Sequence, residues 1–195
     1  GIGKSSALQL LAWAIKPNLG NHEIQLDEKE IIHKYSKTWI GDYFKKLLNK
    51  EIKIAYKPQR VELIVELFKG HTVKELLTKV DERKIVAELL EDLDISSLTE
   101  RKIEELSGGE LQRVAVVATA ARKADVYYFD EPASFLDITH RIKVAKLIRT
   151  LSEHASVIVV EHDLATLDYI SDEIQIVYGE PACYGIFSQS KAVRR

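Results

Sequence analysis

Cysteine is nearly absent from this 195-residue sequence, in which Cys183 is the only one. A single thiol excludes an internal disulfide framework and a cysteine-ligated zinc or iron–sulfur cluster within this chain. The simplest interpretation of Cys183, which lies among tyrosine and glycine, is a small buried residue. Because the lack of disulfides fits a reducing compartment, we expect a cytoplasmic location.

Long apolar runs are also lacking. No stretch approaches the roughly 18 apolar residues of a membrane span, and no basic segment followed by an apolar one marks a signal peptide. Methionine is absent altogether, even at position 1, so we expect the natural protein to have a segment before Gly1. No charge sign dominates either, because the net charge is −2. The net charge therefore gives no reason to expect a membrane or nucleic-acid partner, and any basic surface must be confined to one part of the protein.

Strand and helix patterns alternate along the chain. An alternating strand pattern occupies residues 52–57. Buried-strand patterns with β-favouring residues occupy residues 124–130 and 156–163, and two final strands are expected at residues 173–179 and 183–188. Helical patterns are expected at residues 4–15 before Pro17 and Gly20, near 41–50, from the Thr72–Glu75 capping box, from Asp81 to about Leu93, and at 138–154. The alternation predicts an α/β domain with a mainly parallel sheet and ligand groups at the carboxyl ends of the strands. We expect one domain over residues 1–195, because no linker or repeat divides the chain.

The chain begins with GIGKSS, which fills the end of the phosphate-loop pattern G-x-x-x-x-G-K-[ST]. Backbone N–H groups at the start of a helix would cradle phosphate oxygens there. The candidate nucleotide-binding residues of this segment are Gly1, Ile2, Gly3, Lys4, Ser5 and Ser6. Lys4 would neutralise phosphate charge, and the Ser5 hydroxyl would bind Mg²⁺. The alternative is an unspecialised terminus followed by an ordinary helix.

The stretch VYYFDEP delivers two acids, Asp130 and Glu131, to the end of an apolar strand. An acidic pair at such a position is costly unless it has a partner or a task. Asp130 would hold Mg²⁺, usually through water, and Glu131 would orient and deprotonate an attacking water. The alternative is a solvated strand end that carries two acids.

The stretch LSGGELQR places Ser107, Gly108 and Gly109 at the start of a helix. The hydroxyl, the unhindered N–H groups and the helix dipole together favour an anion. A simple helix cap, the alternative, explains Ser107 and one glycine but not the whole string. About 100 residues separate this stretch from Lys4, which leaves room for only a small helical subdomain, expected at roughly residues 62–122.

In this order, LSGGE, DEP, SFLD and VVEHD resemble the nucleotide-binding domain of ATP-binding-cassette proteins, and the resemblance covers essentially the whole chain. It implies a P-loop NTPase of the cassette type whose helical subdomain carries the signature motif, with ATP and Mg²⁺ as ligands. It also implies that Gln59 is the Q-loop glutamine, Asp137 the D-loop aspartate and His162 the switch histidine near the γ-phosphate. Magnesium would be held by Ser5, Gln59 and Asp130. A lone histidine after a strand is otherwise more often a plain surface or core residue.

In such families two domains face each other head to tail. Ser107 and Gly109 would contact ATP held by the partner's phosphate loop, so one domain lacks a complete site. Finer segments, among them KSSALQLLAWAIKPNLG, YKPQRVELI and DLATLDYISD…YGEPACYG, resemble the first nucleotide-binding domain of the ABC-E ribosome-recycling ATPases, also called the RNase L inhibitor family. That resemblance implies ATP-driven separation of ribosomal subunits. The implied partners are the second cassette, the ribosome with its small subunit and RNA, and a release or rescue factor.

This sequence departs from the ABC-E pattern in several places. The iron–sulfur domain, the first strands with their adenine-stacking aromatic residue, and the second cassette are not in it. Arg60 stands where an aromatic residue is expected after the Q-loop glutamine. No residue can therefore be assigned to adenine, and we expect little ATPase activity from this chain alone.

Other interpretations remain open at this point. A membrane transporter's ATPase subunit shares these motifs, whereas a chromosome or repair protein would insert long heptad coiled coils that are absent here. Basic residues gather in two places, on the helix after Asp137 (Arg141, Lys143, Lys146, Arg149) and in the polar segment before the first strand (Lys45, Lys46, Lys50, Lys53). A solvated charged face is the simplest interpretation of these residues, and phosphate contacts with ribosomal RNA are the alternative.

Overall fold

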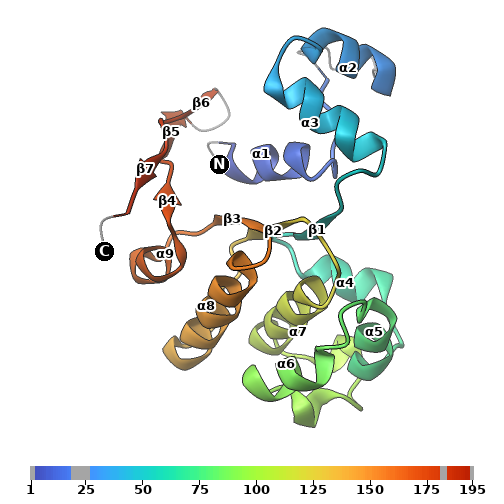
Figure 1. Ribbon diagram of the computed structural model, residues 1–195. Coiled ribbons are helices and arrows are strands. Elements are labelled where there is room, and N and C mark those ends of the chain that lie inside the picture. The colour runs from blue at the N-terminus through green and yellow to red at the C-terminus, as the bar shows by residue number, and fades with distance from the viewer. Residues whose placement is uncertain (1–2, 19–26, 181–183, 194–195) are drawn as a thin grey trace.

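The computed structural model describes residues 3–18, 27–180 and 184–193, and its centre is a three-stranded parallel sheet (Figure 1). The strands β1 (Ile54–Lys57), β2 (Val126–Asp130) and β3 (Ser156–Val160) lie in that order, with β2 in the middle. Tyr56 is level with Tyr128 and Asp130 with Val160 in the register. Because parallel strands end at the same edge, residues that follow β1, β2 and β3 are brought together there.

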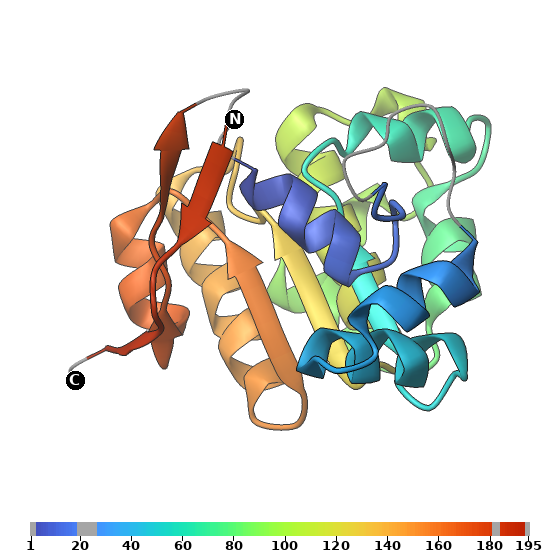
Figure 2. The same ribbon diagram turned by 90° about the horizontal axis from the view of Figure 1, so that it is seen from above.

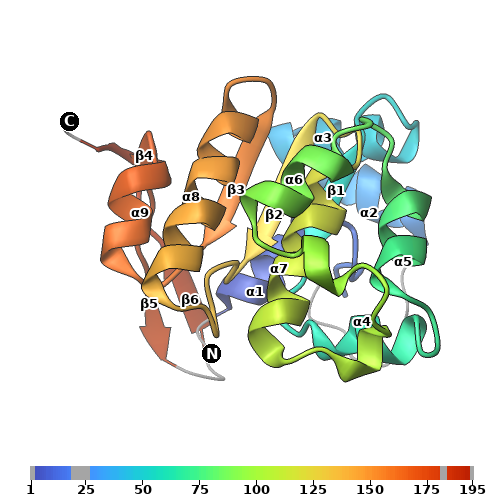
Figure 3. The same cartoon turned by 90° about the horizontal axis from the view of Figure 1, so that it is seen from below.

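Helices cover both faces of the sheet, as Figures 1 and 2 show. One face carries α1 (Lys4–Leu11), with α2 (Glu28–Tyr35) and α3 (Trp39–Leu48) beyond it. The other face carries α7 (Gly108–Ala120) and α8 (Ile138–Ser152), which Figure 3 shows from below. Side chains alternate along β2, so Tyr128 packs against α1 while Tyr127 and Phe129 join the larger core on the α7 and α8 side.

A group of short helices lies between β1 and α7 in the chain and packs beside α7 (Figure 3). It contains α4 (Glu62–Leu67), α5 (Val73–Val80), α6 (Val86–Asp92) and two 3₁₀ turns, Ser96–Leu98 and Ile103–Glu105. The predicted capping box is confirmed, because the Thr72 hydroxyl accepts a hydrogen bond from the Glu75 N–H at the start of α5. Asp81 does not begin the next helix as expected. Its carboxylate accepts from the N–H of Ile85, and α6 starts one residue later.

The C-terminal part forms α9 (Leu164–Ile170) and two small antiparallel ladders. One pairs β4 (Glu173–Ile174) with β7 (Lys191–Ala192), and the other pairs β5 (Val177–Glu180) with β6 (Tyr184–Phe187). The final strands were expected, but within the described residues they lie apart from the parallel sheet. Cys183 lies outside the described residues, so its expected burial stays a prediction.

In the N-terminal third, one expectation is wrong and one helix was not expected. The first helix ends at Leu11 rather than near residue 15, because Trp13 adopts a left-handed backbone with φ 55°, and Ala14 is therefore exposed. A helix that the sequence did not suggest, α2, buries only Ile31. In the described parts of the chain, no helix is both long and apolar enough to cross a membrane.

Candidate functional site

Four segments that are far apart in the sequence meet at the carboxyl edge of the sheet. They are the first turn of α1, the residues after β1, the end of β2 and the residues after β3. Gly3 precedes α1 with φ 92°, a left-handed conformation that favours glycine and that turns the chain into the helix. Gly1 and Ile2 lie outside the described residues.

The Glu131 carboxylate is the centre of this cluster. One oxygen, Oε1, accepts a hydrogen bond of 2.9 Å from the Gln59 amide and lies 3.5 Å from Nε2 of His162. The other oxygen accepts from the Ser134 hydroxyl at 3.0 Å. The structure thus brings together the three residues predicted to act in catalysis, Glu131, Gln59 and His162.

The phosphate-loop residues present here reach the same cluster. The Lys4 ammonium donates to the His162 ring, at 2.8 Å from Nε2. The Ser5 hydroxyl donates to Oε1 of Gln59 at 3.4 Å. The Gln59 amide therefore bridges Ser5 and Glu131, because its nitrogen is turned toward the acid and its oxygen toward the hydroxyl.

Asp130 is fully buried beside this cluster, and neither of its carboxylate oxygens accepts a hydrogen bond from a described residue. Burial raises its pKa above the usual range, although the nearby Ser5 hydroxyl opposes the shift. A buried carboxylate without a donor fits a cation as its missing partner.

Magnesium prefers oxygen ligands, and Ser5, Gln59 and Asp130 supply oxygens of three kinds. The described residues contain no cluster of three or more histidine, cysteine, aspartate or glutamate side chains that could hold a metal ion by themselves. The donor set therefore fits a magnesium ion that also takes water and phosphate oxygens.

The signature segment is built as a helix start on α7. The Ser107 hydroxyl caps the helix by accepting from the N–H of Glu110, while the Glu110 carboxylate accepts from the N–H of Ser107 at 2.7 Å. At Gly108 a side chain would meet open space, whereas at Gly109 it would lie 3.0 Å from the carbonyl oxygen of Phe135. Among the described residues, no hydrogen bond or ion pair joins this segment to Lys4 or Ser5.

Asp137 lies at the start of α8 and caps it. One carboxylate oxygen accepts from the N–H of His140, and the other lies 2.7 Å from Nδ1 of that ring. These hydrogen bonds hold the pKa of Asp137 below its usual range. The far nitrogen of His140 accepts from Arg113 at 2.7 Å, so α7 and α8 are joined next to the signature segment.

Lys57 and Gln112, which the sequence analysis did not select, also reach Glu131. Lys57 Nζ lies 3.2 Å and Gln112 Nε2 2.7 Å from its carbonyl oxygen. A signal for Lys57 was present, because the alternation of β1 puts it on the same face as the buried Ala55. No comparable signal marked Gln112.

The predicted basic surface of α8 is largely paired with acids. Arg141 binds Asp163, Lys143 binds Asp94 and Arg149 binds Asp172. These ion pairs favour the interpretation as a charged face of the folded domain rather than a free phosphate-binding surface.

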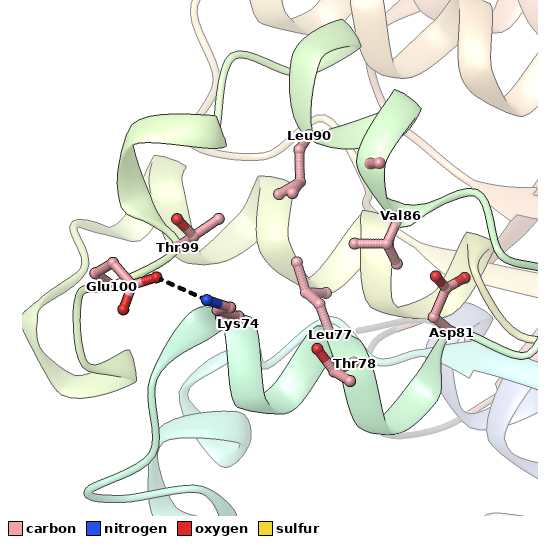
Figure 4. Close-up of a pocket in the computed structure, with 9 residues that line it drawn as sticks. Lys74, Leu77, Thr78, Asp81, Val86, Leu90, Thr99 and Glu100 are labelled. Carbon is pink, nitrogen blue, oxygen red and sulfur yellow. Dashed lines mark hydrogen bonds and ion pairs between the residues drawn. The ribbon is translucent and has the colours of Figure 1, made fainter.

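A separate cavity of about 470 Å³ lies among the short helices, between α5 and α6 (Figure 4). Leu77, Val86 and Leu90 form its apolar part, and the Lys74–Glu100 ion pair lies at its edge. None of the predicted site residues lines it.

The fold and these motifs identify the class of protein. The family model described as ABC transporter matches residues 1–134, and the chain belongs to this family of ATP-binding cassettes. The predicted fold, a P-loop NTPase of the cassette type, is therefore confirmed. Membership implies a domain that binds nucleotide.

Comparison with individual proteins defines the branch. Over its full length the chain is 46% identical to an uncharacterized ABC transporter ATP-binding protein of Methanocaldococcus jannaschii and 44% identical to ABC transporter E family member 1 of Arabidopsis thaliana. A crystal structure of an archaeal ribosome recycling factor, in complex with the archaeal ribosomal stalk protein, matches 99% of this chain and 37% of that chain with a TM-score of 0.91 and 47% identity. The predicted resemblance to the ABC-E branch is confirmed. The chain spans 32% of the length of each of the two curated relatives.

Proposed function

We propose that this chain is an ATP-binding and ATP-hydrolysing domain that works in ribosome recycling as part of a longer protein with two cassettes. The observation that carries the proposal is the cluster around Glu131. Gln59 and His162 contact its carboxylate, Ser5 and Lys4 join the cluster through Gln59 and His162, and the buried Asp130 is the preceding residue. The similarity to an archaeal ribosome recycling factor supports the assignment to recycling.

The proposed roles follow the chemistry of each group. Backbone N–H groups of residues 1–6 cradle the phosphates, and Lys4 neutralises their charge. Ser5, Gln59 and Asp130 hold Mg²⁺, which when bound offsets the charge that develops on the phosphates. Glu131 accepts the proton of the attacking water while the Gln59 amide holds its carboxylate in place, and His162 lies close to the γ-phosphate.

The signature residues serve the other cassette in this proposal. Ser107, Gly108 and Gly109 present a hydroxyl and N–H groups at a helix start, which is suited to an anion, yet they are not joined to Lys4 or Ser5 among the described residues. By the ABC-E resemblance they contact ATP on a second, head-to-tail cassette, with Asp137 beside that contact, and roughly residues 62–122 form the helical subdomain that carries them. The further partners are the ribosomal small subunit with its RNA and a release or rescue factor, in the cytoplasm. The iron–sulfur domain of the longer protein rests on the ABC-E resemblance alone.

The second candidate is the ATPase subunit of a membrane transporter, because the matching family model carries that description. The coding sequence on either side of this chain distinguishes the recycling factor from the transporter subunit. A recycling factor requires a cysteine-rich segment upstream and a second GKT phosphate loop downstream, and the absence of both would contradict the proposal.

Subunit dissociation measured with the full-length protein tests the function directly. We expect the protein with ATP to convert ribosomes into subunits on sucrose gradients over many turnovers. Glu131→Gln should lower multiple-turnover ATP hydrolysis by about 100-fold or more, because it removes the base while leaving the Mg²⁺ and phosphate contacts. Glu153→Gln, the same change at an exposed residue after α8, is the matched control and should behave as the wild type.

Two outcomes count against the proposal. ATP hydrolysis without any subunit dissociation, in the presence of termination or rescue factors, would reject the recycling role. Unchanged hydrolysis by Glu131→Gln would reject the role of Glu131.

A further inference from the structure

The backbone at Glu131 is strained. Its φ is +48°, in the left-handed region that residues other than glycine, asparagine and aspartate rarely adopt. Such a conformation persists only where surrounding groups hold it, and it decides the direction in which the side chain leaves the backbone. At Glu131 that direction takes the carboxylate to Gln59 and His162.

Lys57 is one of the groups that hold this backbone. It lies at the end of β1 on the face that packs against α7, and it is the only fully buried cation among the described residues. Its ammonium donates to two consecutive carbonyl oxygens, those of Asp130 at 2.9 Å and Glu131 at 3.2 Å. Burying an ammonium in an apolar layer is unfavourable, and burial lowers the pKa of Lys57 to about 8.

Gln112 also holds the Glu131 carbonyl. It is fully buried on α7, and its amide nitrogen donates to the carbonyl oxygen of Glu131 at 2.7 Å. Its amide oxygen has no hydrogen-bond partner among the described residues, so the bond to Glu131 is its one side-chain hydrogen bond there. Because Ser107 caps α7 and Gly108 and Gly109 form its first turn, this bond links the helix that carries the signature segment to Glu131.

We propose that Lys57 and Gln112 are positioning residues that fix the strained Glu131 peptide, so that the placement of α7 becomes part of the geometry for hydrolysis. This inference rests on the proposed ATPase function and on the role of Glu131 in it. Neither side chain forms a hydrogen bond or ion pair with Lys4 or Ser5 in the described parts of the chain, so we expect nucleotide binding to change little when either is replaced.

Full-length protein carrying Gln112→Met tests the proposal, because methionine keeps the volume but removes the amide donor. We expect kcat to fall about 10- to 100-fold, the loss typical of a catalytic group displaced by about 1 Å, with the KM for ATP changed by less than about threefold. Lys57→Met should lower kcat in the same way with little change in KM. If the Lys57→Met protein does not fold, the Gln112→Met variant alone decides the test. Thr119→Val, which removes a buried hydroxyl on the same helix, is the control and should keep the wild-type kcat.

A double-mutant cycle distinguishes positioning from a general loss of structure. If Gln112 acts through Glu131, adding Gln112→Met to Glu131→Gln should lower the residual single-turnover rate by less than about threefold. An equal loss in both backgrounds, or a raised KM with kcat unchanged, would overturn the inference. A wild-type rate for Glu131→Gln itself would reject the proposed function. Loss of turnover in Glu131→Gln, with normal turnover in Gln112→Met and Lys57→Met, would reject only the positioning role.

Discussion

At Glu131 the side chain and the main chain have separate sets of partners. The carboxylate is held by Gln59 and Ser134, while the carbonyl oxygen is held by Lys57 and Gln112. A residue fixed at both ends has little freedom to reorient, which suits the proposed role of Glu131 as the base that accepts a proton from one water molecule. Asp130, one position earlier, accepts no such hydrogen bond on its carboxylate among the described residues, which fits its proposed role as a ligand of Mg²⁺.

Glu110 gives a pH-dependent prediction at the residue scale. Hydrogen bonds from the Ser107 N–H and the Ser107 hydroxyl lower the pKa of Glu110, and Arg101 pairs with it at 3.0 Å. Because the folded-state pKa is below the unfolded value, the stabilisation is present above the usual glutamate pKa and is lost as the pH falls through the folded value. Urea unfolding should show Glu110→Gln to be less stable than the wild type by about 1 kcal/mol at pH 7. That difference in stability should shrink as the pH is lowered. A difference that grows in acid would show that the ionised Glu110 carboxylate does not stabilise the fold.

Among the elements, α2 and α3 cross so closely that a glycine is needed at the contact. A Cβ added to Gly41 on α3 would lie 2.0 Å from the carbonyl oxygen of Tyr35 at the end of α2. An aromatic contact then packs α3 against the turn that follows α1, with the rings of Phe44 and Trp13 4.8 Å apart. The pair of helices is thus positioned over α1, the helix that begins with Lys4.

We therefore expect Gly41→Ala to force the two helices apart and to lower the free energy of unfolding by about 2 kcal/mol or more, because a backbone atom cannot rotate away. Urea unfolding of the chain measures this. Gly108→Ala is the matched control, since its added Cβ meets nothing within 4 Å and it should change stability little. Equal effects of the two substitutions would show that crowding at Tyr35 is not the cause.

The elements also show which features a sequence can predict. The strand predicted at residues 124–130 and the helix predicted at 138–154 agree with β2 and α8 to within two residues at each end, because apolar strands and long helices carry strong local signals. The cluster of Gln59, Asp130, Glu131 and His162 followed from motif order. Helix α2 was missed because it buries only Ile31, and Gln112 was missed because its partner is 19 residues away and appears only after folding. The early end of α1 depends on one backbone angle at Trp13.

At the scale of the whole molecule, the proposed function gives the chain two half-sites. Lys4 and Ser5 contact His162 and Gln59 of the cluster around Glu131, whereas Ser107, Gly108 and Gly109 form a helix start that is not joined to them among the described residues. Two cassettes arranged head to tail would complete both sites. In that arrangement, the hydrogen bond from Gln112 to Glu131 would connect the signature segment, which contacts ATP on the other cassette, with the cluster around Glu131, which contacts ATP on its own cassette.

Retention of labelled ATP by the full-length Glu131→Gln variant tests the central claim most directly. Because the variant keeps the Mg²⁺ and phosphate contacts but lacks the base, it should hold ATP in the closed state after rapid gel filtration. Adding Lys4→Ala should abolish this retention at the same site, and the chain by itself should neither retain ATP nor hydrolyse it at a substantial rate. Release of nucleotide by Glu131→Gln at the wild-type rate, or robust turnover by the chain alone, would contradict the claim.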